Sequence, residues 1–163
     1  MLTLPVGQAF GQADTIIVYK INNASFNLKN KYMKSMKIIS GILRLVVAII
    51  LLQTLYFKFT AHPDSVHIFS ELGVEPWGRI FLGIVELITA ILILIPGTAL
   101  IGMVISLGII MGAVASHLLV LGINVSNDGG VLFILALIVL IASTTYLVLH
   151  KGELMASLKK LKS

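Results

Sequence analysis

The sequence predicts an all-α protein embedded in a membrane as a bundle of four transmembrane helices. Two observations lead to this prediction. Of the 163 residues, 58% are hydrophobic and only 12% are charged, whereas an ordinary soluble domain has about a quarter of its residues charged. The apolar residues also gather into four long runs, which one small globule cannot hide from water. The membrane interior is therefore the natural solvent for this chain.

Each of the four runs is close to the length that a transmembrane helix needs. A helix rises about 1.5 Å per residue, so about 20 apolar residues cross the roughly 30 Å of hydrocarbon. Backbone amides in lipid need internal partners, which favours helices for runs of this length. We expect a membrane domain over residues 36–151, with spans at residues 38–57, 78–95, 98–121 and 130–149.

The basic residues predict the orientation of these spans, because cytoplasmic flanks carry an excess of Lys and Arg. Those at or before the start of the first span are Lys29, Lys31, Lys34, Lys37 and Arg44, and those after the last span are Lys151, Lys159, Lys160 and Lys162. At the opposite ends of the spans there are fewer, namely Lys58 and Arg79. Both termini are therefore expected in the cytoplasm, with residues 152–163 as a basic tail, in a multi-pass protein of the cell (inner) membrane. Because these charges flank apolar runs and form no folded basic patch, no nucleic-acid partner is expected.

The connections between the spans predict how neighbouring helices run. Pro96-Gly97 is short enough to make an antiparallel hairpin of the second and third spans. The longer loop after the first span is expected to carry a short helix at about residues 64–72. Pro63 suits its start and Gly73 suits its end.

Residues 1–35 differ in kind from the rest. They contain one short apolar stretch, at residues 15–18, and no apolar core of about 7–15 residues after a basic start, which argues against a cleaved signal peptide. Two interpretations are open: a cytoplasmic leader, whose composition allows disorder, or a start codon assigned too early. Met33 and Met36 stand just before the first span, as the second interpretation requires.

The chain offers no sign of an enzyme that acts on its own. It has no cysteine, which excludes disulfides, thiolate metal sites and thiol redox chemistry. No segment resembles a phosphate-binding Gly-rich loop or a Ser-His-Asp set. The spacing of His62, His67 and Glu71 is compatible with zinc, but such short patterns in polar loops are usually solvated side chains, so no metal site is expected.

Glu86 is the most informative residue, because it lies near the middle of the second span. A charged side chain costs about 2.5–3.5 kcal/mol at that depth, so Glu86 needs a partner or must be protonated. Gly83 and Ala90 share its helix face, which is therefore expected to point into the bundle. Gly108 and Gly112 form a GxxxG pattern on the third span, opposite its polar side, where we expect a tight helix contact.

Three further ionisable residues are candidates for a polar cluster with Glu86. Arg44 lies about two turns into the first span, and Lys58 falls on nearly the same side at the far end. His117 lies about one turn from the corresponding end of the third span. Two neutral side chains complete the candidate lining: Ser106 and Tyr146.

Two interpretations of this cluster are open. In the first, Glu86, Arg44, Lys58 and His117 line one cavity that binds a polar headgroup or passes protons, since buried carboxyl and imidazole groups can exchange protons near neutral pH. In the second, Arg44 extends to the headgroups, Glu86 is a paired or neutral structural carboxyl, and His117 is an interfacial side chain.

Several short motifs occur in a defined order along the spans. They are Tyr56-Phe57-Lys58-Phe59 at the end of the first span, Leu72-Gly73 and Pro76-Trp77 in the following loop, Gly83-Ile84-Val85-Glu86 in the second span, and Gly112-Ala113 with His117 in the third. In their order and spacing the chain resembles the DoxX-like family of small four-helix membrane proteins. The resemblance runs from about Met36 to His150 and leaves residues 1 to about 35 without a counterpart.

The resemblance implies a function associated with quinones. The family takes its name from a membrane subunit associated with thiosulfate:quinone oxidoreductase, so the implied role is an accessory subunit beside a quinone or a redox enzyme. Glu86, Arg44, Lys58 and His117 are the matching positions. No covalently bound cofactor is expected, and a quinone is the implied ligand. The alternatives are a small-solute or proton carrier, expected as a homo-oligomer because four helices enclose little volume, and a purely structural membrane partner.

Overall fold

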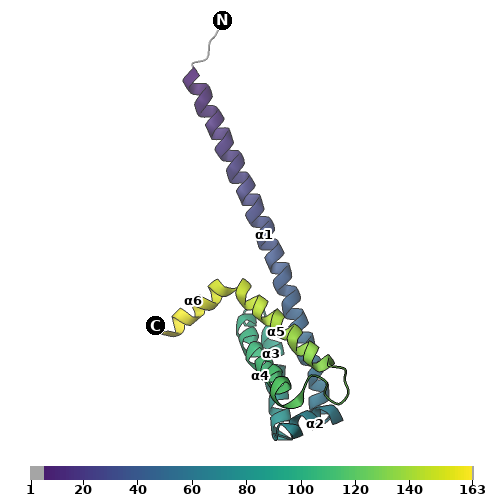
Figure 1. Cartoon of the computed structure of the whole chain (residues 1–163). Coiled ribbons are helices and arrows are strands. Elements are labelled where there is room, and N and C mark those ends of the chain that lie inside the picture. Colours follow the sequence, from purple (N-terminus) through teal and green to yellow (C-terminus); the bar gives the residue numbers. More distant parts are fainter. Residues whose placement is uncertain (1–5, 163) are drawn as a thin grey trace. The chain divides into compact units, whose positions relative to one another are not determined.

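The structure is a computed structural model that describes residues 6–162, with side chains described for residues 17–160. The described residues form helices and contain no strand, which confirms the predicted all-α class. In chain order the elements are α1 (Val6–Phe59), α2 (Pro63–Glu71), α3 (Trp77–Leu94), α4 (Ala99–Ser116), the π-helical turn η1 (His117–Leu121), α5 (Val131–Leu149) and α6 (Lys151–Lys162) (Figure 1).

Four of the described helices are long and apolar enough to cross a membrane: Ile17–Phe59, Trp77–Leu94, Ala99–Leu121 and Val131–Leu149. Each overlaps one of the apolar runs found in the sequence, so the prediction of a four-span membrane protein is confirmed. Large apolar side chains point outward along these helices, and Leu119 is 82% exposed. A protein in water would bury such side chains, whereas a protein surrounded by lipid tails exposes them. The cytoplasmic location of the termini stays a prediction.

The chain divides into two units after Ile39. In the first unit, α1 is helical from Val6 onward, although the sequence analysis assigned no helix to residues 1–35. Apolar side chains over residues 17–32 have helical spacing, but polar residues separate them, so they form no long apolar run. The second unit begins at Ser40 and contains the spanning helices with their connections.

The short helix predicted after the first span is present as α2. Pro63 occupies its first turn, where the missing N–H of proline leaves no hydrogen bond unmade. Nδ1 of His62 accepts a hydrogen bond from the backbone amide of Asp64 at 3.4 Å. Gly73 follows the helix with φ of 71°, the left-handed conformation that ends helices. Its amide donates to the Ser70 carbonyl at 2.9 Å.

The predicted hairpin of the second and third spans is also present, since α3 and α4 pack side by side after Pro96-Gly97 (Figure 1). Gly102 lies where they approach most closely. A Cβ atom added there would come within 2.8 Å of the backbone nitrogen of Ile93. Only a residue without a side chain permits this approach. Below, the end of the bundle with Pro96 is called the Pro96 end, and the opposite end is called the α2 end.

The apolar core draws on all four spanning helices. Its fully buried members include Val47, Ala48, Ala90, Ile93, Met103 and Val139. Many of these residues belong to the turns near the Pro96 end. Towards the α2 end, polar side chains and a cavity take the place of the apolar core.

Candidate functional site

Glu86 is buried, with 5% of its surface exposed, and it has two partners on α1. Nζ of Lys58 lies 2.8 Å from Oε2 of Glu86. The Thr54 hydroxyl lies 2.9 Å from the same oxygen and 2.8 Å from the Leu51 carbonyl, so its single proton can serve either acceptor. Thr54 and Lys58 are four residues apart and therefore share one face of α1. The carboxyl group thus has the charged partner that burial in an apolar surrounding requires.

A second ion pair holds the backbone at Lys58. Arg79 is buried and donates through Nη1 to the Lys58 carbonyl oxygen. Its Nη2 lies 2.7 Å from Oε1 of Glu75. In the sequence, Arg79 served only to predict orientation, and this pair was not predicted. Glu75 lies in the turn before α3 and Arg79 lies in its first turn, so no helical spacing signalled their contact.

A cavity of 590 Å³ lies among α1, α3, α4 and α5, and residues of α2 line it at the α2 end. Lys58, Glu86 and His117 line this cavity, so three of the four ionisable candidates occur at one place. Most of the remaining lining is apolar. The other polar lining residues are Gln53, Thr54, Asp64, Ser65, Ser116 and Asp128.

Gly108 and Gly112 form part of the cavity wall. A Cβ atom added at either position would meet nothing within 4 Å. The expectation that this GxxxG pattern makes a tight helix contact is therefore wrong within the chain. The close approach of α4 to α3 uses Gly102 instead. The physical reason is that the bare GxxxG face is turned to a hollow, where the absence of two side chains adds volume to the cavity.

His117 begins the π-helical turn η1 and is buried. Its Nδ1 lies 2.9 Å from the Gly122 carbonyl, and because a carbonyl only accepts, Nδ1 carries the proton. The ring contacts Phe133 edge to face, with centroids 5.5 Å apart. In the neutral ring, Nε2 is then an acceptor. The π-helical turn ends this span at Leu121, and Gly122 follows with φ of 77°.

Arg44 is not part of this group. Its Nε donates to the Ile93 carbonyl at 2.7 Å, and its Nη2 donates to the Leu94 carbonyl at 2.5 Å. These are carbonyls at the end of α3, which have no partner within the helix. Arg44 therefore satisfies the C-terminus of α3 at the Pro96 end and neither lines the cavity nor contacts Glu86.

The two neutral candidates also lie outside the cavity lining. The Ser106 hydroxyl is 3.2 Å from the Ser143 hydroxyl, and this buried pair joins α4 to α5. Tyr146 stacks on His150, with ring centroids 4.2 Å apart. Nδ1 of His150 lies 3.0 Å from the Tyr146 carbonyl and Nε2 lies 3.4 Å from the Ser40 hydroxyl. This second polar group links α1 to α5 near the Pro96 end.

Asp128 fixes the loop before α5 and lines the cavity. Burial raises the pKa of its carboxyl group, but hydrogen bonds from the backbone amides of Leu132, Gly130 and Val125 outweigh burial, so the net pKa is lowered. The proximity of His117 lowers the pKa further. Asp128 is thus an anion held at the start of α5, where the helix dipole favours negative charge.

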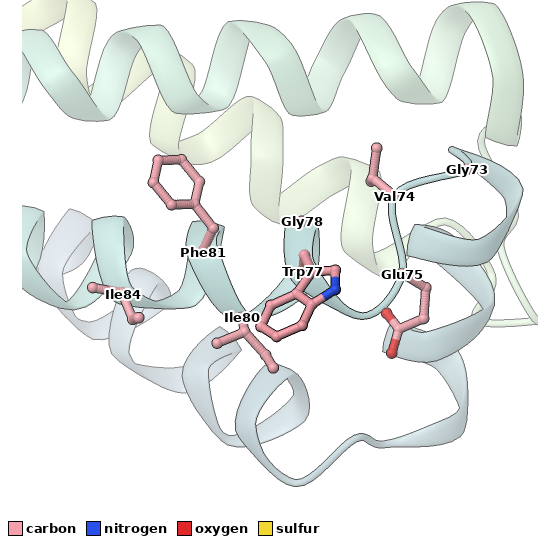
Figure 2. A pocket seen from close by; sticks show the side chains of 8 residues that line it. All are labelled: Gly73, Val74, Glu75, Trp77, Gly78, Ile80, Phe81 and Ile84. Carbon is pink, nitrogen blue, oxygen red and sulfur yellow. The ribbon is translucent and has the colours of Figure 1, made fainter.

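An apolar groove lies on the outer surface beside the start of α3 (Figure 2). Its lining includes Ile80, Phe81, Ile84 and Trp77, of which Trp77 is 78% exposed. The one charged lining residue, Glu75, is paired with Arg79. This groove has the character of a surface that faces lipid, with tryptophan at the end of the helix as is common near headgroups. It offers no group for chemistry.

The described residues contain no group of three or more His, Cys, Asp or Glu residues that could hold a metal ion. Nδ1 of His62 lies 3.4 Å from a carboxylate oxygen of Asp64. This contact stays within the first turn of α2.

Comparison with known protein families shows where this chain belongs. The model of the DoxX-like family matches residues 42–144, which is more than half of the chain. The matched residues include those that line the cavity. No curated protein and no solved structure matches the chain. The resemblance found in the sequence is therefore confirmed by the family match.

Proposed function

Because this chain belongs to the DoxX-like family of membrane proteins, we propose that it is an accessory subunit of a quinone-linked redox system and that its cavity binds the quinone head group. The main support is the Lys58–Glu86 ion pair in the wall of a largely apolar cavity. Apolar walls with a few well-placed polar groups are typical of small-molecule sites. The basic flanks of the spans support an inner-membrane location with both termini in the cytoplasm.

The polar groups of the cavity suit the chemistry of a quinone. Quinone carbonyl oxygens accept hydrogen bonds, and the hydroxyl groups of the reduced form donate them. The Lys58 ammonium group is a donor. Nε2 of His117 accepts a hydrogen bond when the ring is neutral and donates one when the ring is protonated. A bound quinone supplies electron and proton transfer, while this chain binds the head group and holds exchangeable protons at Lys58, Glu86 and His117.

The pairing of Lys58 with Glu86 also suits a neutral ligand. The two charges balance, so a neutral head group can enter without adding net charge to the membrane interior. An unbalanced charge there would be costly. The same balance makes the site a poor one for a ligand that carries a charge of its own.

A second candidate is a carrier of protons or small solutes. One observation favours it: Glu86 and His117, which can both exchange protons, line the same cavity. A dry, packed bundle with Glu86 bonded to Arg44 would favour the purely structural alternative. Glu86 instead contacts Lys58 and Thr54 beside a cavity.

The proposal is tested by titrating the purified full chain in nanodiscs with ubiquinone and with menaquinone. Glu86→Gln keeps the shape of the side chain and removes its charge. Gly112→Leu fills the cavity from a position where a Cβ meets no other atom within 4 Å. Gly41→Leu is the matched control, because the same change is made where a Cβ also meets nothing within 4 Å, on a residue outside the cavity lining.

In variants that circular dichroism shows to be folded, saturable binding that is lost in Glu86→Gln and Gly112→Leu but kept in Gly41→Leu supports a head group in the cavity. Binding that survives in all three variants assigns the quinone to another surface. If the wild-type chain does not bind either quinone, the quinone role fails. Proton flux into liposomes then tests the carrier, with Glu86→Gln and His117→Gln as the variants expected to lose it.

A further inference from the structure

Helix α1 is longer than a membrane crossing requires. It has 54 residues, whereas about 20 cross the hydrocarbon. The unit that contains the other spanning helices begins only at Ser40. Residues 17–37 contain five lysines and no acidic residue, and charges at this density are not accommodated in hydrocarbon. The segment is therefore a helix with a function outside the membrane interior.

The apolar side chains of this segment form a stripe. Ile17, Ile21, Leu28 and Tyr32 follow one another in steps of four, seven and four residues, which keeps them on one helix face. Their side chains are 54%, 61%, 69% and 63% exposed. Four other exposed apolar or aromatic side chains lie off this stripe: Val18, Tyr19, Phe26 and Met33. The other polar positions are five lysines, four asparagines and two serines: Lys20, Lys29, Lys31, Lys34 and Lys37; Asn22, Asn23, Asn27 and Asn30; Ser25 and Ser35.

Spacing along the stripe distinguishes a flat partner from a helical one. Ile17 and Leu28 are eleven residues apart, as are Ile21 and Tyr32, and eleven residues make about three turns. The stripe therefore runs almost straight along the helix. A left-handed coiled coil needs apolar residues at sustained steps of seven. Ile21 and Leu28 are one such step, but the next leads to Ser35, and steps from Ile17 lead to Ala24 and then Lys31, so no heptad is sustained. The pattern suits a flat surface better than a partner helix.

Charge then indicates the chemistry of that surface. A helix with five lysines and no acidic side chain complements a surface rich in phosphate groups. The segment is continuous with a transmembrane helix, and a bend of α1 near Ile39, at the boundary between the two units, would lay it against such a surface. We propose that residues 17–37 of α1 bind the anionic headgroups of the bilayer, with the apolar stripe at the boundary of the acyl chains and the lysines reaching the phosphates. This proposal does not depend on the quinone role.

The absence of cysteine from the chain makes a fluorescence test straightforward. Single cysteines are introduced at Leu28, on the apolar stripe, or at Asn30, about half a turn away, and are labelled with an environment-sensitive dye. The full chain is placed in nanodiscs that hold one copy each, made either from zwitterionic lipid alone or with anionic phospholipid added. The charge variant replaces Lys20, Lys31, Lys34 and Lys37 with glutamine in the Leu28→Cys chain.

The expected result is a blue shift of the dye at Leu28→Cys, absent at Asn30→Cys, that depends on anionic lipid and disappears in the charge variant. Circular dichroism of the charge variant checks that the helix persists. Equal emission from the two positions overturns the proposal, as does a shift at Leu28→Cys that is independent of lipid charge. A shift that arises only when several copies share a disc also overturns it and assigns the stripe to a second copy of the chain.

Discussion

Lys58 Nζ lies 2.8 Å from Glu86 Oε2, and the two side chains are only 11% and 7% exposed. The pair connects α1 to α3 within the cavity wall. Transfer of either charge alone from water into such a place costs several kcal/mol, and the attraction between the two offsets much of this cost. The structure therefore depends on the balance of the pair more than on either residue.

A double-mutant cycle tests this balance. Lys58→Met leaves a buried carboxylate without its partner, and Glu86→Gln leaves a buried ammonium group. Each should lower the free energy of unfolding by up to about 3–5 kcal/mol, while the double variant should recover much of the loss. Unfolding of the chain by SDS in mixed micelles measures all four proteins. Additive losses would contradict the direct coupling of the two side chains.

Arg44 should behave differently, because it binds backbone carbonyls and no carboxylate. Arg44→Gln removes donors from the last carbonyls of α3 and is expected to cost about 1–3 kcal/mol of unfolding free energy. Arg44→Lys should recover only part of this, since one ammonium group does not match the two guanidinium nitrogens that reach separate carbonyls. Ligand binding in the cavity should be unchanged in both variants. Loss of binding in Arg44→Lys would connect this residue to the site after all.

The sequence was sufficient to predict the spans and the burial of Glu86, because length, apolarity and the cost of a buried charge depend on each helix alone. It did not identify the partner of Glu86. Arg44 and Lys58 lie on nearly the same side of α1, so which of them pairs with Glu86 depends on their positions along the helix. Because α1 and α3 run antiparallel, Arg44 lies beside Ile93 near one end of α3, and Lys58 reaches Glu86 from the other end.

Two other features could not be read from single helices. The GxxxG pattern has the composition of a contact face, and only the arrangement of the other helices turns it towards a cavity. Nothing in the sequence distinguishes Thr54 within its apolar run. Its role depends on the packing of α3 against α1, which places Oε2 of Glu86 2.9 Å from the Thr54 hydroxyl. The Glu75–Arg79 pair joins the turn before α3 to the first turn of that helix, a contact that helical spacing does not predict. Contacts between elements are thus the part of the site that the sequence left undetermined.

Two glycines of α4 should respond in opposite ways to the same change. In Gly102→Ala, the added Cβ would come within 2.8 Å of the Ile93 backbone, so the helices must separate at an expected cost of about 1–3 kcal/mol. In Gly108→Ala, the Cβ meets nothing within 4 Å, and the higher helix propensity of alanine should raise stability by up to about 1 kcal/mol. Thermal unfolding in detergent compares the two variants. Equal effects would refute the assignment of Gly102 as the closest contact.

Asp128 should make stability depend on pH in the acid range. Its pKa lies below the ordinary 3.8, because backbone amides of Leu132, Gly130 and Val125 outweigh the opposing effect of burial. A carboxyl group with a lowered pKa in the folded state stabilises the fold fully above its unfolded pKa and loses this contribution as pH falls through the folded value.

Asp128→Asn provides the comparison, because asparagine keeps one acceptor oxygen and does not titrate. At pH 7 the variant should be less stable by about 1–2 kcal/mol, as for the loss of a helix-capping carboxylate. The difference from the wild type should begin to shrink as pH falls below about 4, where the Asp128 carboxyl of the unfolded chain becomes protonated, and should level off once pH has fallen through the lower folded-state pKa. Unfolding in mixed micelles between pH 7 and pH 3 measures this difference, and other carboxylates cancel because both proteins contain them. A difference that stays constant over this range would mean that the amides around Asp128 do not favour its charged form.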